Sequence, residues 1–314
     1  MVQNTSKLTT NINKSRGFKM SRDLPIYGLL LPGVILLIIF HYLPLFGIVI
    51  AFQDFVPFKG VIASKWVGFR NFAYFLTDEN FWLVMKNTLE INIMQIIFGF
   101  PVPILFALFL NELWSNRFKK TVQTISYLPH FISWVVAASI VTSILSPSTG
   151  IVNQFLKNVF GIQPIHFLAM PKYFRPIIII SSIWKEFGMN AVYYMAALSS
   201  IDLQLYEASR IDGAGKLRQT WHITLPGIKN ITIVLLVLQV GSLVTIGFER
   251  IFLLYNPLVY EVGDVISTYT YRIGIEQARY SLTAAIGFTQ SFVNFILVYL
   301  TNRLAKAFAG WALW

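Results

Sequence analysis

The chain of 314 residues contains no cysteine and few charged side chains. Without cysteine, disulfides, thiolate metal sites and cysteine nucleophiles are all excluded. Soluble domains carry about 25% charged residues, whereas this chain has 12% charged and 55% hydrophobic residues. Together with a mean hydropathy of +0.61, this composition predicts a membrane protein rather than a soluble domain.

Sequence signatures for nucleotide and metal binding are also missing. No GxxxxGK[ST] string occurs, so the sequence predicts no phosphate-binding loop of its own. The histidines have no i, i+4 partner and no neighbouring set of ligands, which is not the spacing of a metal site. We therefore expect no metal and no other cofactor in this chain. The histidines are His41, His130, His166 and His222.

The net charge of +11 does not predict a nucleic-acid partner. A nucleic-acid binder gathers Lys and Arg on one solvated face. Here the basic residues fall in short gaps between apolar runs, and basic short loops are typical of the cytoplasmic side of membrane proteins. We therefore expect membrane lipid, and no nucleic acid, around this chain.

The apolar runs predict an all-α bundle of six transmembrane helices in residues 25–314, preceded by a cytoplasmic tail over residues 1–24, in which the polar stretch Met1–Met20 is expected to be disordered. A bilayer core about 30 Å thick needs roughly 20 apolar residues per helix, since lipid offers the backbone no other hydrogen-bond partner. The predicted spans are approximately Ile26–Phe52, Thr88–Leu110, Thr121–Leu145, Pro176–Leu198, Ile231–Phe248 and Leu282–Leu300.

The distribution of Lys and Arg predicts the orientation of these spans. With the N-terminus inside, the cytoplasmic segments collect 14 basic residues, against ten in the longer outer loops, where seven acidic residues accompany them. By the positive-inside rule, both termini are cytoplasmic. The outer loops at 53–86 and 145–175 are rich in aromatic residues. These fit either a docking surface for an external partner or ordinary interfacial belts, and both interpretations stay open.

The long cytoplasmic connection at residues 199–230 is predicted to be folded. Asp202 is placed to cap a helix over Leu203–Ile211, and Gly213 supplies the left-handed residue that ends this helix. A second helix follows over Ala214–Ile223. We therefore expect two short helices joined by a tight glycine turn beneath the membrane.

The string EASRIDGAGKLRQTWHITLP in this connection resembles the EAA motif of binding-protein-dependent ATP-binding-cassette (ABC) importers. That motif reads Glu-Ala-Ala, then Asp-Gly-Ala, then Ile-x-Leu-Pro about ten residues after the glycine. The spacing agrees throughout, with a serine in place of the third alanine and Thr220 where carbohydrate permeases often carry phenylalanine. The matching positions are Glu207, Ala208, Ser209, Asp212, Gly213, Ala214, Ile223, Leu225 and Pro226.

Three further strings, YLPHFISWVV, SPSTGIVN and YNPLVYEVGDVISTYTYR, are similar to carbohydrate-uptake permeases, so the resemblance covers nearly all of the chain after Leu24. It implies a type I ABC importer permease fold whose cytoplasmic loop forms coupling helices. The nine motif positions would couple this chain to a separate ATPase, with Glu207 offering its carboxylate to a basic group there.

The resemblance also implies the partners and the role of the chain. They are a second homologous permease forming a heterodimer, two ABC ATPase subunits that hold ATP and Mg, an extracytoplasmic solute-binding protein and a saccharide. The chain would be a permease without enzymatic activity in the bacterial cytoplasmic membrane. An oligosaccharide or polysaccharide fragment is favoured as substrate, including acidic examples such as alginate or pectin fragments.

Polar side chains within the predicted spans are candidates for the substrate pathway, because a charge in the bilayer costs a few kcal/mol. Sugars are held by hydrogen bonds and by aromatic faces. The alternative for Lys185 and Glu186 is a structural ion pair at the outer end of the span, and for the amides it is helix packing. The candidates are Trp184, Lys185, Glu186, Asn190, Tyr193, Asn92, Gln95 and Gln239.

Two other function classes fit the sequence less well than an energy-coupled permease. A secondary transporter driven by an ion gradient needs inverted repeats and paired acidic residues at mid-membrane, and no clear repeat is visible. An intramembrane enzyme needs a nucleophile and base, or a metal pair, within the spans. The scattered histidines do not provide such a group.

Overall fold

The computed structural model describes residues 20–310. Most of the predicted tail over residues 1–24 therefore lies outside the described part of the chain. The chain divides into two units, residues 1–49 and 50–314, and each is described by itself.

The first unit is built around one apolar helix. It comprises α1 (Met20–Leu37), a π-helical turn (Ile38–Tyr42), α2 (Leu43–Leu45) and the start of a 3-10 segment (Phe46–Phe52). The π turn ends two residues before Pro44, whose missing N–H interrupts the regular hydrogen-bond pattern. The continuous run Tyr27–Phe52 is long and apolar enough to cross a membrane. It agrees with the predicted first span, Ile26–Phe52.

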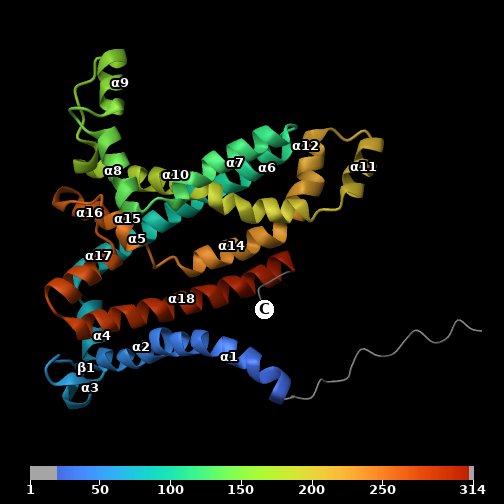
Figure 1. Ribbon diagram of the computed structural model, residues 1–314. Coiled ribbons are helices and arrows are strands. Elements are labelled where there is room, and N and C mark those ends of the chain that lie inside the picture. Colours follow the sequence, from blue (N-terminus) through green and yellow to red (C-terminus); the bar gives the residue numbers. More distant parts are fainter. Residues whose placement is uncertain (1–19, 311–314) are drawn as a thin grey trace, which may run out of the picture. The chain divides into compact units, whose positions relative to one another are not determined.

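The second unit is a bundle of long helices that run between two ends of the molecule (Figure 1). One end carries α11 and α12, and the other carries α4, α16 and α17. The long helices are α5 (Glu79–Met94), which continues through a π turn (Gln95–Gly99) into α6 (Pro101–Glu112), α7 (Asn116–Phe131), α8 (Trp134–Leu145), α10 (Pro171–Ser199), α14 (Lys229–Gly241) and α18 (Tyr280–Ala309).

Short elements connect these helices. A two-stranded antiparallel sheet pairs β1 (Gln53–Asp54) with β2 (Lys65–Trp66), with Gln53 opposite Trp66. The remaining elements are α3 (Gly60–Ala63), α4 (Arg70–Leu76), α9 (Ile151–Phe160), a 3-10 turn (Phe167–Ala169), α11 (Leu203–Ile211), α12 (Lys216–Gln219), a π turn (Thr220–Thr224), α13 (Leu225–Gly227), α15 (Phe248–Phe252), a 3-10 turn (Pro257–Val259), α16 (Tyr260–Gly263), α17 (Ile266–Tyr271) and a π turn (Arg272–Glu276).

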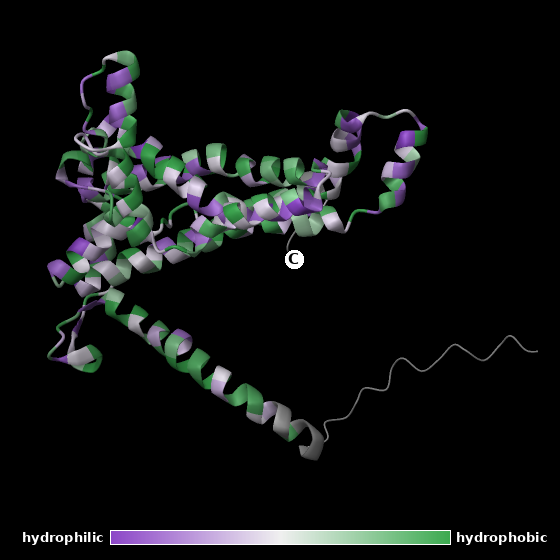
Figure 2. Cartoon of the chain, turned by 45° about the horizontal axis from the view of Figure 1, so that its top comes forward, coloured by the Kyte–Doolittle hydropathy of each residue, from purple (hydrophilic) through white to green (hydrophobic). Residues whose placement is uncertain are grey.

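The described residues contain three helices long and apolar enough to span a membrane, Tyr27–Phe52, Glu79–Glu112 and Tyr280–Ala307, or up to five if each of two bent pairs is one span. Hydrophobic residues dominate these long helices in Figure 2. The predicted fourth span lies within α10, which is 29 residues long but carries charged residues along its length. The predicted count of six is therefore one more than length and composition support.

The prediction that the third span, Thr121–Leu145, is one continuous helix was wrong. It is broken between α7 and α8, whose axes meet at 102°. Pro129 lies in the last turn of α7, and the Ser133 side chain accepts a hydrogen bond from Val136 N at 3.3 Å to start α8. A proline and a new N-cap therefore end one helix and begin another.

Helix α10 is central to the packing of the second unit, because it contacts α6, α7 and α14. Gly188 allows α10 and α7 to approach closely, since a Cβ at this position would collide with the backbone of Ser126. One buried cluster next to α10 contains Phe174, Ile178 and Ile251. The conformation of α10 is thus fixed along most of its length by buried contacts.

The segment between α14 and α18 is folded rather than a simple loop. Helix α14 ends at Gly241, seven residues before the predicted end of the fifth span at Phe248. Two side chains of α5 hold the following segment: Asn92 Nδ2 donates to Leu243 O and Thr245 O, at 2.6 and 3.1 Å, and Thr88 Oγ1 accepts from Ile266 N at 3.0 Å. These bonds satisfy backbone groups that would otherwise be unpaired.

Candidate functional site: a pair of loop helices and a polar cavity between helices

The loop at residues 199–230 folds largely as its sequence predicts. Helix α11 spans Leu203–Ile211, and the Asp202 side chain caps it by accepting from Gln204 N at 2.9 Å. Gly213 has φ +76°, a left-handed conformation that glycine adopts at low cost. Backbone bonds from Gly213 N to Arg210 O, at 3.0 Å, and from Ala214 N to Ser209 O, at 2.8 Å, close the turn.

The second helix of the loop is longer than predicted. It begins at Lys216 and continues through a π turn and α13 to Gly227, instead of ending at Ile223. Pro226 is tolerated because it sits in the first turn of α13. The break follows at Ile228, where the axis turns by 57° into α14.

A side-chain contact that the sequence did not predict joins the two helices of the loop. Gln219 is buried, and its Nε2 donates to Ser209 Oγ at 2.9 Å, while the Ser209 hydroxyl donates to Tyr206 O at 2.8 Å. Ser209 is the position where the EAA motif usually has alanine. The serine therefore has a structural partner here, which depends on how the two loop helices lie against each other.

The acidic motif residues and several apolar side chains of the loop are exposed. Glu207 and Asp212 are exposed, and within the described residues the Glu207 carboxylate forms no hydrogen bond or ion pair. The exposed apolar side chains are Leu203 (73%), Ile211 (88%), Leu217 (89%) and Trp221 (70%). Exposed apolar surface of this kind marks an interaction site.

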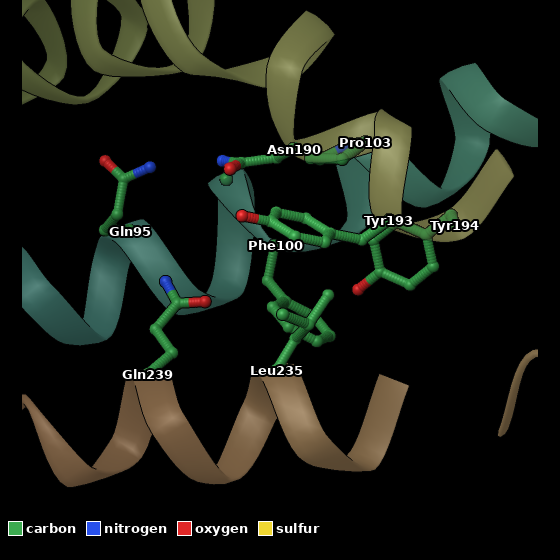
Figure 3. A pocket seen from close by; sticks show the side chains of 9 residues that line it. Gln95, Phe100, Pro103, Asn190, Tyr193, Tyr194, Leu235 and Gln239 are labelled. Carbon is green, nitrogen blue, oxygen red and sulfur yellow. The ribbon is translucent and has the colours of Figure 1, made fainter. Parts of the chain in front are cut away.

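A small polar cavity of about 130 Å³ is enclosed by three parts of the bundle. They are the π turn after α5 with the start of α6, helix α10, and helix α14. Four of the eight predicted pathway residues line it: Gln95, Asn190, Tyr193 and Gln239 (Figure 3). Gln95 belongs to the π turn, and Gly99 leaves room for its amide, since a Cβ there would collide with it. Gln95 Oε1 is buried and has no partner among the described residues.

The other predicted pathway residues lie elsewhere. Lys185 is 5% exposed and its Nζ donates to His130 O at 2.9 Å, while Glu186 Oε2 lies 2.7 Å from His130 Nδ1. The side-chain amide of Asn92 donates its hydrogen bonds to the backbone carbonyls of Leu243 and Thr245, as the packing interpretation predicts. Trp184 lines a separate apolar hollow between α8, α9 and α10.

The contact between His130 and Glu186 was not predicted, because 56 residues separate the two side chains along the sequence. Lys185 is also not at the outer end of its helix, as the ion-pair interpretation assumed, but has 14 residues of α10 on either side of it. Lys185 and Glu186 therefore stabilise the break between α7 and α8 and do not line the polar cavity.

Comparison with known proteins gives the family. Residues 92–310 match the family described as the binding-protein-dependent transport system inner membrane component. The chain belongs to this family. It is 44% identical over 290 residues to the polygalacturonan/rhamnogalacturonan transport system permease protein YteP of Bacillus subtilis (strain 168), covering 92% of this chain and 90% of YteP. It is 27% identical to the arabinooligosaccharides transport system permease protein AraP of the same strain, covering 89% and 88%.

Solved structures agree with this assignment. The permease resembles a chain of a bacterial ABC transporter involved in the import of the acidic polysaccharide alginate, with a TM-score of 0.84, 43% identity, and coverage of 92% of this chain and 97% of that chain. A second structure of a bacterial alginate ABC transporter, in complex with alginate pentasaccharide-bound periplasmic protein, gives a TM-score of 0.85 at 41% identity, with coverage of 94% and 98%. The predicted type I ABC importer permease fold is thus confirmed, and the chain is a permease subunit of an ABC transporter.

Proposed function

We propose that this permease moves an acidic oligosaccharide, or a fragment of an acidic polysaccharide, into the bacterial cytoplasm from an extracytoplasmic solute-binding protein. The observation that carries the proposal is similarity above 40% identity, over more than nine-tenths of the chain, to permeases named for polygalacturonan/rhamnogalacturonan and for alginate. Polymers of uronic acids present a carboxylate on each unesterified sugar unit. A common acidic substrate class accounts for both similarities.

The energy for transport comes from partner subunits in this proposal. The sequence has no phosphate-binding loop, so two ABC ATPase subunits bind ATP and Mg. The exposed Leu203, Ile211, Leu217 and Trp221 supply an apolar surface for a groove on an ATPase. Glu207 offers its unpaired carboxylate to a basic group at the rim of that groove.

Motion passes to the spanning helices because the loop is rigid. The bond between Gln219 and Ser209 joins the two loop helices, and the 57° turn at Ile228 leads directly into α14, which lines the polar cavity through Leu235 and Gln239. Displacement of α11 and α12 by the ATPases therefore moves a wall of the cavity. Alternating access follows if this movement opens the cavity to one side at a time.

The polar cavity is this chain's share of the sugar pathway, and a second homologous permease supplies the facing half. Ligand pockets of drug size occupy about 300–1,000 Å³, whereas this cavity holds about 130 Å³. The helices must therefore separate before a sugar unit enters. Gln95, Asn190, Tyr193 and Gln239 then provide amide groups and a phenol for hydrogen bonds to sugar hydroxyls.

The proposal is tested on the complex that co-purifies with the permease, reconstituted in lipid nanodiscs. ATP hydrolysis is measured with the solute-binding protein of the same operon, loaded with oligogalacturonate, with an alginate pentasaccharide or with a neutral arabino-oligosaccharide of similar length. An acidic saccharide should raise hydrolysis above the level with unloaded binding protein, and the neutral one should not. Equal stimulation by the neutral saccharide would contradict the substrate class, and absence of an ATPase from the complex would contradict the energy source.

A further inference from the structure

Two polar hollows adjoin at the end of the bundle opposite α11 and α12, close to α4, α17 and the start of α18 (Figure 1). The first, of about 560 Å³, lies between Asp54, Arg70 and Tyr280. The second, of about 370 Å³, lies between Asp78, Tyr269 and Arg272. Tyr74 and Arg279 line both hollows. We call the two hollows together the Arg279 groove.

The first wall of the Arg279 groove is held in place by amide and hydroxyl groups. Asn71 Nδ2 donates to Ala51 O and Gln53 O, at 2.8 and 2.9 Å, which fixes α4 against β1. Phe55 N donates to Ser281 Oγ at 2.9 Å and so joins the end of β1 to the first turn of α18. This wall is therefore preformed and does not depend on a ligand.

The second wall is fixed by a phenol and an arginine. Tyr269 Oη donates to Asp78 Oδ2 at 2.5 Å. Burial, together with the bond to this carboxylate, raises the pKa of Tyr269, so the phenol stays protonated as the donor. Arg272 Nη2 lies 2.5 Å from Asp264 Oδ2. The carboxylate of Asp78 and the guanidinium of Arg272 thus each have a partner within the protein.

Arg279 differs from the other two arginines of the groove. Arg70 pairs with Asp54 at 3.3 Å, and Arg272 pairs with Asp264. Arg279 Nη1 donates to Tyr74 Oη at 3.2 Å, and within residues 20–310 its guanidinium forms no ion pair with a carboxylate. One guanidinium at the junction of two hollows is therefore left for an external anion.

The backbone beside Arg279 is in an unusual conformation. Ala278 has φ +54° and is the non-glycine residue with positive φ in the described chain. Residues with a Cβ rarely adopt this region, and such positions cluster at ligand sites. Two backbone bonds, from Gln277 N to Arg272 O at 3.1 Å and from Arg279 N to Ile273 O at 2.9 Å, hold it. This conformation directs the chain so that Arg279 stands at the junction.

We propose that the Arg279 groove binds an acidic saccharide, with Arg279 paired to the carboxylate of one uronate unit. The planar guanidinium matches a carboxylate in bidentate geometry. It lies over the Tyr74 ring, 6.0 Å from the ring centroid, and the partly exposed Tyr280 (37%) offers an apolar face for the sugar. Each hollow falls within the usual size range of ligand sites. The inference rests on the proposed function, which places this end of the bundle outside the membrane and makes the substrate acidic.

The test uses the full-length permease with its co-purifying subunits in nanodiscs, without the solute-binding protein. The probes are trigalacturonate and its fully methyl-esterified form, which keeps the shape and removes the charge, and binding is measured by isothermal calorimetry and saturation-transfer NMR. Trigalacturonate should bind at least 10-fold more tightly than the ester. Arg279→Gln should weaken its binding at least 10-fold, while Arg303→Gln, at an exposed site near the far end of α18 and outside both hollows, should change it less than 2-fold.

Several outcomes would overturn the inference. Equal binding of the acid and its ester to the unaltered protein would exclude a carboxylate site, and this comparison needs no variant to fold. Equal binding to the Arg279→Gln variant would place the site elsewhere. If trigalacturonate does not bind, and Arg279→Gln instead weakens association with the solute-binding protein, the groove is a protein contact. In each case, ATP hydrolysis that an acid-loaded binding protein still stimulates shows that the proposed function stands while the groove site falls.

Discussion

The ammonium group of Lys185, at the middle of α10, lies 2.9 Å from the backbone carbonyl of His130, one residue before the end of α7. The last carbonyls of a helix have no N–H partner within it. Lys185 supplies a donor to one of them at the 102° break between α7 and α8. The neighbouring Glu186 contacts the His130 ring, so two adjacent residues of α10 hold the broken span.

Replacing the lysine should therefore destabilise the break. We expect Lys185→Met to lower the free energy of unfolding by about 2 kcal/mol, because a helix-end carbonyl and the Glu186 carboxylate lose a charged donor. Unfolding of the purified permease in mixed micelles measures the change. Lys172→Met, at an exposed site on the same helix, should change stability by less than about 0.5 kcal/mol. Equal effects of the two variants would contradict the role of Lys185.

Substitutions of Gln95 and Asn92, which lie in neighbouring turns, should distinguish a role in transport from a role in helix packing. Gln95 Oε1 is buried without a partner, so Gln95→Leu should leave stability unchanged or raise it, yet reduce uptake about 10-fold if the amide contacts sugar. Asn92→Leu should cost about 2–3 kcal/mol, because Leu243 O and Thr245 O lose their donor. Thermal unfolding and uptake into proteoliposomes give the two readouts. Loss of stability in Gln95→Leu with normal uptake would assign this residue to packing.

The EAA motif should be needed for coupling but not for insertion. Glu207→Ala removes a carboxylate that has no partner among the described residues, and Gly213→Pro forces φ to about −65° where the chain has +76°. We expect both variants to insert at normal levels and to abolish uptake. Glu276→Ala, an exposed acid at the opposite end of the bundle, is the control. Normal uptake by Glu207→Ala or by Gly213→Pro would weigh against the coupling role.

The positive φ of Ala278 should lower the free energy of unfolding of the permease. A left-handed residue with a Cβ costs about 1–2 kcal/mol relative to glycine, so Ala278→Gly should stabilise the permease by about 1 kcal/mol. Ala305→Gly, in the helical interior of α18, should destabilise it by about 1 kcal/mol. Chemical denaturation compares the two. Destabilisation by Ala278→Gly would show that Ala278 carries no conformational cost in the native chain.

Much of the loop at residues 199–230 was predictable from residues close together in the sequence. Asp202 is an N-cap, Gly213 lacks the Cβ that would make its positive φ costly, and the limits of α11 follow from these two residues. The first span was equally predictable, because an apolar run longer than about 18 residues is typical of a transmembrane helix. These features depend on residues close together in the sequence.

The parts that could not be predicted depend on distant partners. Pro129 signalled the break in the third span, but its sharpness also needs Ser133 and the lysine of another helix. The segment after Gly241 folds because Asn92 and Thr88 of α5 satisfy its backbone, and a single sequence does not reveal such pairings. Likewise, the bond between Gln219 and Ser209 requires knowing how the two loop helices lie against each other.

Cross-linking can show whether the helix pair around Gly213 lies in the cytoplasm against an ATPase, as we propose. The native chain has no cysteine, so L217C, at a position 89% exposed, carries a single maleimide photocrosslinker in the assembled complex. We expect L217C to cross-link to the ATP-hydrolysing subunit and I275C, at the opposite end of the bundle, not to do so. An impermeant maleimide should label L217C only after cells are opened. Labelling from outside intact cells, or a complex in which L217C reaches no ATPase, would contradict this proposal.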